Sequence, residues 1–343
     1  MEPLTYREAG VDIDAGDEAV RRIAPLARAT RRPEVLGGIG AFAAFVGVPA
    51  GYREPVLVSS TDGVGSKLKV AFMADRHSTV GIDLVAMGVN DVLVHGAEPL
   101  YFLDYVGVAR VDPARVEAIV AGVAEGCRRA GCALVGGETA ELPDLYRAGE
   151  YDLAGFAVGV VERARIVDGH GVKPGDRVLG LASSGLHSNG YSLARRIVFD
   201  VLRLDVSSTF PGTDRTVADE LLEPTRIYAD AVKMLLEVVP VAAMAHVTGG
   251  GLTGNVPRVL PEGCRVAIHR GNWRVPRVFE TLREAGRVED AEMFRTFNMG
   301  IGYVVIVDPE AAERAAAALV LAGETVYALG VVVAGPRGVE ILS

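Results

Sequence analysis

Three acidic residues stand next to small or polar neighbours at widely separated points of the sequence. Asp62 precedes the glycines of STDGVGSK, Asp91 follows Asn90 in a segment with helical spacing, and Glu138 follows a glycine pair at the expected end of a strand. Carboxylates that arrive from three segment ends suit Mg²⁺, which binds oxygen and needs only one or two carboxylates when ATP phosphates supply other ligands. Each residue taken alone has a plainer explanation, as a cap, a local ion pair or the end of a hairpin. Jointly, Asp62, Asp91 and Glu138 predict a metal and nucleotide site.

The STDGVGSK segment also contains Gly63, Gly65, Ser66 and Lys67. Glycine allows the backbone to come close to an anion and exposes amide N–H groups to it. The segment is not a P-loop, because the spacing GxxxxGK[ST] occurs nowhere in the chain, and GGIGAF does not fit the dinucleotide pattern GxGxxG. An ordinary Asp-Gly turn is the structural alternative. Lys67 has two open roles, contact with phosphate or pairing with a neighbouring carboxylate.

Two loops in the second half have the composition of anion sites. SSGLHSNGYSL (Ser183–Leu193) and HVTGGGLTGN (His246–Asn255) each lie between an expected strand and an expected helix, where helix N-terminal amides favour anions. The alternatives are a simple N-cap by Ser188 or Asn189 and a core position for His246. The chain contains no GxSxG, no HExxH and no evident Cys–His pair, so its residues favour charge stabilisation over covalent catalysis.

Alternating strand and helix patterns supply the elements that hold these residues. Ser78–Pro99 has the apolar spacing of a helix, and Asp83 and Asp91 stand close to two helical turns apart, so they share a face. Asp112 caps the following helix, which ends at Gly131. With the apolar runs around these helices, the first half predicts an α/β sandwich of about four strands and two helices.

The glycine-rich stretch Asp168–Val178 separates the first half from a second half of the same style. A strand near Val178–Ala182 and a helix near Thr225–Val238 are typical of that half. The chain therefore predicts two domains, residues 1–168 and residues 169–343.

The composition excludes several classes of protein. The chain has 343 residues, 50% of them hydrophobic, and a formal net charge of −9 from 35 basic and 44 acidic side chains. No Lys/Arg block recurs along a face, which argues against nucleic-acid and membrane-surface partners. The amino-terminal segment lacks the basic and apolar regions of a signal peptide, and no run approaches the roughly 20 apolar residues of a membrane span. The three cysteines form no CxxC pair, so we expect a cytoplasmic protein with reduced thiols.

Long blocks of the sequence occur in an order known from one family. They include YREPVLVSSTDGVGSKLKVA, GIDLVAMGVNDVLVHGAEPLYFLDY, LVGGETAEL, SSGLHSNGYSL, HVTGGG and RTFNMGIG. Over essentially its whole length the chain resembles the phosphoribosylformylglycinamidine cyclo-ligase family, also called aminoimidazole ribotide synthetases. The resemblance implies a two-domain α/β (α+β) fold and a homodimer, in which the amino-terminal sheets of two subunits pair as a central β-barrel and α/β carboxyl-terminal domains lie outside.

The resemblance also implies a reaction of purine biosynthesis that uses ATP and Mg²⁺. Phosphorylation of the amide oxygen of formylglycinamidine ribonucleotide turns that oxygen into a good leaving group. The amidine nitrogen then attacks the same carbon, which closes the imidazole ring and gives aminoimidazole ribotide, ADP and phosphate. A requirement for a monovalent cation stays open.

Matched position by position, the resemblance assigns metal, nucleotide and substrate residues. The metal ligands are Asp62, Asp91 and Glu138. The cofactor-binding residues are Asp62, Gly63, Gly65, Ser66, Lys67, Asn90, Asp91, Gly137 and Glu138. The substrate-binding residues are Ser183, Ser184, Gly185, His187, Ser188, Asn189, His246, Gly249 and Gly250. Lys67 and His187 are the candidates for catalysis.

Other ATP-using enzymes share the implied fold, so fold alone does not fix the function. Selenophosphate synthetase usually has a reactive cysteine or selenocysteine in an amino-terminal glycine-rich region, whereas the stretch before Asp62 contains no cysteine. Thiamine-monophosphate kinase would lack GGETAEL and GLHSNGYSL in this form. A hydrogenase-maturation relative would end in a cysteine, whereas this chain ends in GVEILS. A non-enzymatic binding module would leave the acidic segment ends and glycine loops unexplained.

Overall fold

The chain forms two sheets, and helices pack against both. The computed structural model describes residues 5–40 and 42–343; residues 1–4, which begin the amino-terminal segment discussed above, and Ala41, within GGIGAF, lie outside the described residues. The elements of the first half are α1 (Ile13–Arg28), β1 (Pro55–Gly63), α2 (Leu68–Ala74), α3 (Ser78–Leu93), β2 (Glu98–Val108), α4 (Pro113–Ala130), β3 (Ala133–Glu141) and β4 (Tyr151–Glu162).

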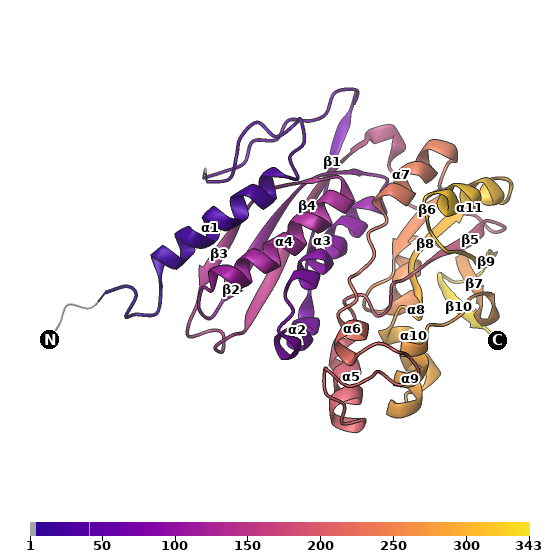
Figure 1. The fold of residues 1–343 in the computed structure, drawn as a ribbon. Coiled ribbons are helices and arrows are strands. Elements are labelled where there is room, and N and C mark those ends of the chain that lie inside the picture. The colour runs from indigo at the N-terminus through magenta and orange to yellow at the C-terminus, as the bar shows by residue number, and fades with distance from the viewer. Residues whose placement is uncertain (1–4, 41) are drawn as a thin grey trace.

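The first sheet has the strand order β1-β4-β2-β3, in which β2 and β3 run parallel and the other neighbours run antiparallel. Helices α3 and α4 cover one face, with α1 beside α4 (Figure 1). Along β4, Leu153 and Ala157 are buried, whereas Ala154 and Phe156 between them are exposed. Because neighbouring residues of a strand point to opposite faces, one face of this sheet is packed and the other is open.

Capping residues and glycines explain how α4 packs on α3. Asp112 caps α4 as predicted, by accepting from the backbone N–H of Ala114 at 3.0 Å, and Gly131 ends the helix with φ of 68°. Gly122 lies where the two helices meet, and a Cβ atom there would be 1.8 Å from the carbonyl oxygen of Ser78. The close approach of the helices therefore depends on the absence of a side chain at this position.

The second half forms a second sheet with the strand order β10-β7-β9-β5-β8-β6, in which only β10 and β7 run parallel. Its elements are β5 (Arg177–Ala182), α5 (Tyr191–Arg195), α6 (Val217–Leu221), α7 (Ala229–Val238), β6 (Ala243–His246), α8 (Gly251–Asn255), β7 (Cys264–His269), α9 (Arg277–Gly286), α10 (Asp290–Thr296), β8 (Ile301–Val307), α11 (Ala312–Leu321), β9 (Val326–Ala334) and β10 (Gly338–Leu342). Strands β1 and β6 are edge strands of the two sheets, and α3 contacts both of them.

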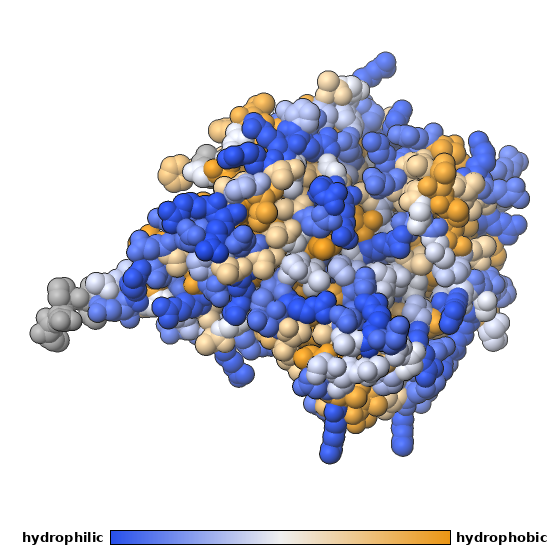
Figure 2. Space-filling model, viewed as in Figure 1, coloured by the Kyte–Doolittle hydropathy of each residue, from blue (hydrophilic) through white to orange (hydrophobic). Residues whose placement is uncertain are grey.

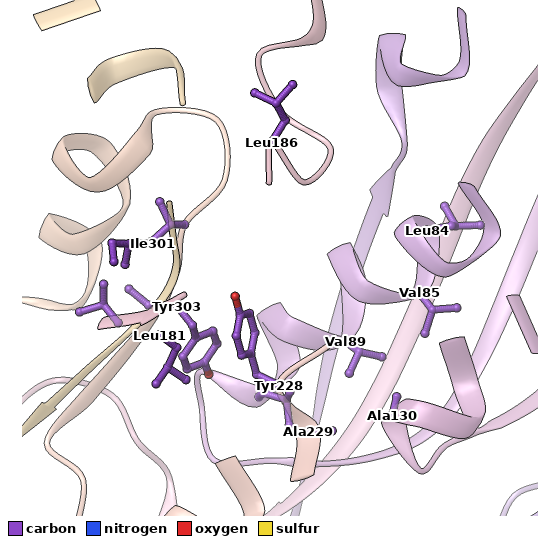
Figure 3. Packing of buried hydrophobic residues seen from close by; sticks show 14 of the residues in the cluster. Leu84, Val85, Val89, Ala130, Leu181, Leu186, Tyr228, Ala229, Ile301 and Tyr303 are labelled. Atoms are coloured by element: carbon purple, nitrogen blue, oxygen red, sulfur yellow. The ribbon is translucent and has the colours of Figure 1, made fainter. Parts of the chain in front are cut away.

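A continuous hydrophobic cluster connects the two halves. Figure 3 shows Leu84 and Val89 of α3 in the same cluster as Tyr228, Ala229 and Tyr303 of the second half. All five side chains are buried. Burial of apolar surface at this boundary stabilises the arrangement of the halves, at roughly 25 cal/mol for each Å² removed from water. The two-domain α+β fold expected from the sequence is confirmed, and the expected boundary at residues 168/169 falls between β4 and β5.

Three element boundaries differ from the expectation. Helix α3 ends at Leu93, and Pro99 lies within β2 instead of ending the helix. The helix expected from Thr225 begins only at Ala229, because the backbone of residues 225–228 binds side chains of α3. Helix α1, of 16 residues, and strand β10, of 5 residues, were not anticipated.

A membrane-spanning helix requires about 20 predominantly apolar residues. Hydrophilic residues cover much of the face in Figure 2, with smaller hydrophobic areas between them. Within the described residues, no helix combines the length and apolar character required to cross a bilayer.

Candidate active site

The structure brings together Asp62, Asp91 and His246, which were predicted from three separate motifs. Asp62 lies near the end of β1, Asp91 near the end of α3, and His246 at the end of β6. His246 Nδ1 lies 2.9 Å from Asp91 Oδ1. Burial raises the pKa of Asp62, and the negative charge of Asp91 raises it further. The two carboxylates therefore form a local concentration of negative charge between the two halves of the chain.

Asn90 positions His246 from the side opposite to Asp91. Its side-chain nitrogen lies 3.5 Å from His246 Nε2 and donates to the carbonyl of Arg226 at 2.8 Å, and its oxygen accepts from the backbone N–H of Tyr228 at 3.2 Å. Asn90 is fully buried. Its amide is thus occupied by the second half of the chain, and in this structure it has no exposed donor for a nucleotide.

Helix α3 presents one face to the second half of the chain. Asp83, Met87 and Asp91 are spaced four residues apart, so they lie on one face of the helix, as predicted for Asp83 and Asp91. Asp83 Oδ1 accepts from the backbone N–H of Thr225 at 2.7 Å, and the Met87 sulfur lies 3.9 Å from Asn189 Nδ2. This helix face therefore contacts the loops at residues 187–189 and 223–228 as well as the end of β6.

A cavity of about 290 Å³ opens between the edge strands β1 and β6. Its lining residues are Val58, Ser59, Ser60, Asp91, Val94, His95, Met244, Ala245, His246, Asn255, Arg258 and Val259. Within it, the Ser60 hydroxyl donates to Asp91 Oδ2 at 3.4 Å. The cavity combines one carboxylate, hydroxyl groups and an arginine with an apolar wall, which is the usual composition of a small-molecule site.

Lys67 pairs with a carboxylate and does not point into the cleft. Its side chain is fully buried, and Nζ lies 2.8 Å from Asp83 Oδ2, 2.9 Å from the His187 carbonyl and 2.7 Å from the Glu223 carbonyl. Burial lowers the pKa of Lys67, and the Asp83 carboxylate opposes that shift. Of the two roles left open by the sequence, the structure has the carboxylate pair. All three ammonium hydrogens are used inside the protein in this structure, and the predicted catalytic, phosphate-binding role of Lys67 stays untested.

His187 is also enclosed by the protein. It has φ of 61°, is 1% exposed, and its Nε2 accepts from the backbone N–H of Ser184 at 3.2 Å. Burial lowers the pKa of His187 well below its usual value, and His246 and Lys67 lower it further. The ring is therefore neutral and carries its proton on Nδ1, which has no hydrogen-bond partner among the described residues. In this geometry His187 shapes its loop, and its predicted role toward phosphate stays untested.

The hydroxyl groups of the Ser183–Asn189 loop are bonded within the protein. Ser183 donates to the Gly185 carbonyl at 2.9 Å, Ser184 donates to the Pro224 carbonyl at 2.6 Å, and Ser188 lies 3.1 Å from the Thr225 hydroxyl. These contacts give the loop a fixed shape. Its backbone, rather than its hydroxyl groups, is thus the part available to a ligand.

The glycine loops adopt the conformations that their sequence suggests. Gly65 has φ of 68° and Gly250 has φ of 102°, a region that side chains disfavour. A Cβ atom on Gly63 would lie 2.9 Å from a carbonyl oxygen of β4. The Ser66 hydroxyl lies 3.2 Å from that of Ser192, so the predicted nucleotide loop adjoins the helix that follows the predicted substrate loop. Gly249 is exposed beside Gly250 at the same cleft.

Glu138 is separated from Asp62 and Asp91 within one chain. Across the sheet, Glu138 lies in one row with Tyr105, Ala154 and Gly63. Asp62 is the residue before Gly63, so its side chain points to the opposite face of the sheet from that of Glu138. Three strand spacings of about 4.8 Å place it about 14 Å from β1. The three-carboxylate cluster predicted from sequence is therefore not formed within a single chain, and no group of three or more His, Cys, Asp or Glu residues suited to a metal occurs among the described residues.

Close packing against β2 explains why residue 137 is a glycine. A Cβ atom there would be 2.1 Å from Asp104 Oδ1 on β2. Burial raises the pKa of Asp104 to about 7. The absence of a side chain thus makes room for the half-buried carboxyl group of Asp104, whereas the sequence had suggested close approach to a ligand.

Sequence reasoning missed several residues that organise the site. Thr225 binds Asp83, and Asn255 binds the carbonyls of Thr248, Gly249 and Gly251 at 3.3, 3.2 and 2.9 Å. Thr225 belongs to none of the motifs, whereas Asn255 ends the predicted HVTGGGLTGN loop, whose carbonyl groups it binds. Two features of the sequence indicated these contacts: the helical spacing of Asp83 and Asp91, and the composition of that loop.

Comparisons with known proteins show the family of the chain. The family model described as AIR synthase related protein, N-terminal domain, matches residues 40–161, and the model of the C-terminal domain matches residues 173–343. Proteins named phosphoribosylformylglycinamidine cyclo-ligase are similar over nearly the whole chain. The one from Anaeromyxobacter sp. (strain K) is 59% identical over 98% of this chain and 97% of its own length, and the one from Geotalea daltonii is 54% identical with the same coverage.

Solved structures with lower identity share the fold. Thiamine-monophosphate kinase from Stenotrophomonas maltophilia aligns with a TM-score of 0.69 at 17% identity, covering 94% of this chain and 95% of its own. Hydrogenase maturation protein HypE in complex with ATP aligns with a TM-score of 0.66 at 20% identity, covering 92% and 88%. These structures support the fold alone, whereas the cyclo-ligases match in sequence throughout. The chain is an enzyme and belongs to the phosphoribosylformylglycinamidine cyclo-ligase family.

Proposed function

We propose that the protein catalyses the ATP-dependent closure of formylglycinamidine ribonucleotide to aminoimidazole ribotide in purine biosynthesis, with release of ADP and phosphate. The observation that carries the proposal is the contact of Asp91 with His246 beside Asp62, which joins a predicted nucleotide segment to a predicted substrate loop at one cleft. Similarity to cyclo-ligases over almost the full chain supports the same reaction.

Asp62 and Asp91 fit the proposed Mg²⁺ site. They are close enough for the charge of Asp91 to raise the pKa of Asp62, so a cation between them relieves a repulsion that exists in the protein alone. Two carboxylates are what Mg²⁺ takes from a protein when phosphates and water complete its shell. When bound, Mg²⁺ neutralises the charge of the ATP phosphates. His246, through its contact with Asp91 Oδ1, restrains the orientation of that carboxylate.

The remaining task of the site is to align two ligands and stabilise charge. The ring-closing nitrogen is already part of the substrate, so positioning supplies much of the acceleration. The β5–α5 loop is held against α3 through Asn189, and the β6–α8 loop is held by Asn255, so both loops present fixed backbone groups to the cleft. We assign no covalent nucleophile to this chain.

The open face of the first sheet supports the proposed homodimer. Leu57, Tyr105 and Phe156 are 57%, 37% and 43% exposed on that face, and a second copy that covered it would bury them. Glu138 lies on the same face, because it pairs with Tyr105. Its proposed role as an Mg²⁺–ATP ligand therefore requires that Glu138 of the partner subunit complete the site of Asp62 and Asp91.

The cytoplasmic location expected from the sequence is part of the same proposal. Cys127, Cys132 and Cys264 are all buried and unbridged, which is usual for a protein kept in a reducing compartment.

The proposed function is tested by following ADP formation by the purified protein with Mg²⁺ and ATP. We expect ADP and aminoimidazole ribotide in equal amounts only when formylglycinamidine ribonucleotide is present. ADP formation that depends instead on thiamine phosphate or selenide would refute the proposal.

A further inference from the structure

Arg258 is an exposed cation at the cleft that no motif singled out. It lies in the short 3₁₀ turn Val256–Val259 after α8 and lines the cavity that also contains Asp91 and His246. Among the described residues that line this cavity, it is the one lysine or arginine. Its guanidinium makes a long contact of 3.5 Å with Asn255 Oδ1, and no described carboxylate oxygen lies within 4.0 Å of it.

The other cations near the cleft are already paired. Lys67 binds Asp83 inside the protein, and Arg226 Nε lies 2.8 Å from Glu324 Oε2. The chain has a net charge of −9, yet both proposed ligands are anions. Among the described residues that line this cavity, Arg258 is therefore the one whose positive charge is available to a phosphate, for which a guanidinium can donate two parallel hydrogen bonds.

Hydrogen bonds connect Arg258 to the substrate side of the cleft. Asn255, its contact, also donates to the carbonyls of Gly249 and Gly251 in the β6–α8 loop. Asp62 and Asp91, the proposed Mg²⁺–ATP ligands, belong instead to the first half of the chain. The two anion-binding parts of the cleft thus come from different halves of the protein, which keeps two negatively charged ligands apart.

The volume and the lining residues of the cavity indicate which part of a phosphate-bearing ligand it can hold. Its volume of about 290 Å³ is at the lower limit of ordinary ligand pockets, so it accommodates part of a nucleotide. Val58, Val94, Met244 and Val259 form an apolar wall suited to the carbons of a sugar, and the Ser59 hydroxyl adds a donor. The arginine, the hydroxyl groups and the apolar wall match the phosphate, hydroxyl groups and carbons of a ribose 5-phosphate group.

We propose that Arg258 binds the 5′-phosphate of the ribonucleotide substrate and is a specificity-determining residue of the enzyme. This inference rests on the proposed function and adds the site of the substrate phosphate to it. The amide that reacts with ATP is separated from that phosphate by the ribose. With the phosphate held by Arg258, the reacting end of the substrate extends toward Asp91 and the nucleotide.

Steady-state kinetics of Arg258→Gln and Arg258→Lys test the proposal. We expect Arg258→Gln to raise the KM for formylglycinamidine ribonucleotide by about 10- to 100-fold, because a charge-assisted pair is lost, and to leave the KM for ATP within about twofold. Arg258→Lys keeps the charge but not the paired donors, so an intermediate KM is expected. Arg314→Gln is the matched control, because Arg314 is exposed on α11 and does not line the cavity.

A binding measurement separates this inference from the proposed reaction. Calorimetric titration with ribose 5-phosphate is expected to give binding to the wild type and to Arg314→Gln, and about tenfold weaker binding or none to Arg258→Gln. Equal binding by all three proteins, an unchanged KM for the ribonucleotide, or an increase in the KM for ATP alone would each overturn the proposal. Failure of the wild type to form ADP with the ribonucleotide would refute the proposed function, and the titration would still test the phosphate site.

Discussion

The buried pair of Lys67 and Asp83 offers a strong test of how the two halves are held together. Replacing Lys67 by methionine keeps most of the length of the side chain and removes the ammonium group. Asp83 then remains fully buried with a charge that only the Thr225 N–H and hydroxyl stabilise, and the carbonyls of His187 and Glu223 lose their donor.

The size of the effect follows from these contacts. Removal of one member of a buried ion pair costs about 3–5 kcal/mol, because the other charge is left uncompensated. We therefore expect Lys67→Met to lower the free energy of unfolding by about 4 kcal/mol, a large part of the usual total of about 5–15 kcal/mol. Adding Asp83→Asn removes the stranded charge and keeps an acceptor for Thr225, so the double variant is expected to recover about 2 kcal/mol.

Urea unfolding measures both quantities. Trp273, the one tryptophan of the chain, is buried in the second half and reports unfolding by fluorescence, and circular dichroism reports both halves. Lys69→Met is the control, because Lys69 is 41% exposed and its pair with Glu150 is a surface contact worth about 0–1 kcal/mol. If Lys67→Met is no less stable than Lys69→Met, or if the double variant shows the sum of the two single effects, the reasoning is refuted.

Three further predictions concern carboxylates. Asp62→Asn is expected to lower turnover at least about 100-fold and to abolish protection by Mg²⁺–ATP in thermal melts. The pKa of Asp62 is raised in the folded protein, so its ionised form opposes folding. Without ligand, the Asp62→Asn variant should therefore melt no earlier than the wild type at pH 7, and the difference in melting temperature should shrink toward pH 4. An earlier melt of the variant at pH 7 contradicts this. If each site is shared between two subunits, mixing inactive Asp62→Asn and Glu138→Gln subunits should restore about one quarter of the wild-type activity. Half of the dimers are then mixed, and each mixed dimer contains one intact site of two. No recovery of activity means that Glu138 does not complete the site. Asp104, with a pKa of about 7, should make the wild type less stable as pH rises from about 4 to above 7, and Asp104→Asn should remove that slope in melts between pH 5 and pH 8.

Local patterns in the sequence were sufficient for most elements and for part of the site. The Asp112 cap and Gly131 at the end of α4 are local signals, and both lie where they were expected. The helical spacing of Asp83 and Asp91 likewise fixes which face of α3 they share. Asp91 meets His246 as well, although they are distant in sequence, because each stands at the end of a predicted element.

Glu138 and Lys67 lie in surroundings that the residues next to them in sequence did not indicate, because contacts between distant segments decide both positions. Strand order and register decide the face on which Glu138 lies, and neither can be read from the residues around it. Lys67 stands among residues typical of a phosphate loop, yet its partner is decided by the docking of α3 on the loop at residues 223–225. In both cases the local residues were consistent with a ligand site, and the tertiary arrangement gave them another environment.

The shared face of α3 has a thermodynamic consequence for the enzyme. Asp91 of this helix belongs to the proposed nucleotide site, while Asp83 and Met87 hold the loops of the proposed substrate site. A rigid helix transmits a movement at one of these contacts to the others, so we expect binding at the two proposed sites to be energetically coupled. Such coupling is reciprocal: the factor by which Mg²⁺–ATP changes the affinity for the ribonucleotide must equal the factor by which the ribonucleotide changes the affinity for Mg²⁺–ATP.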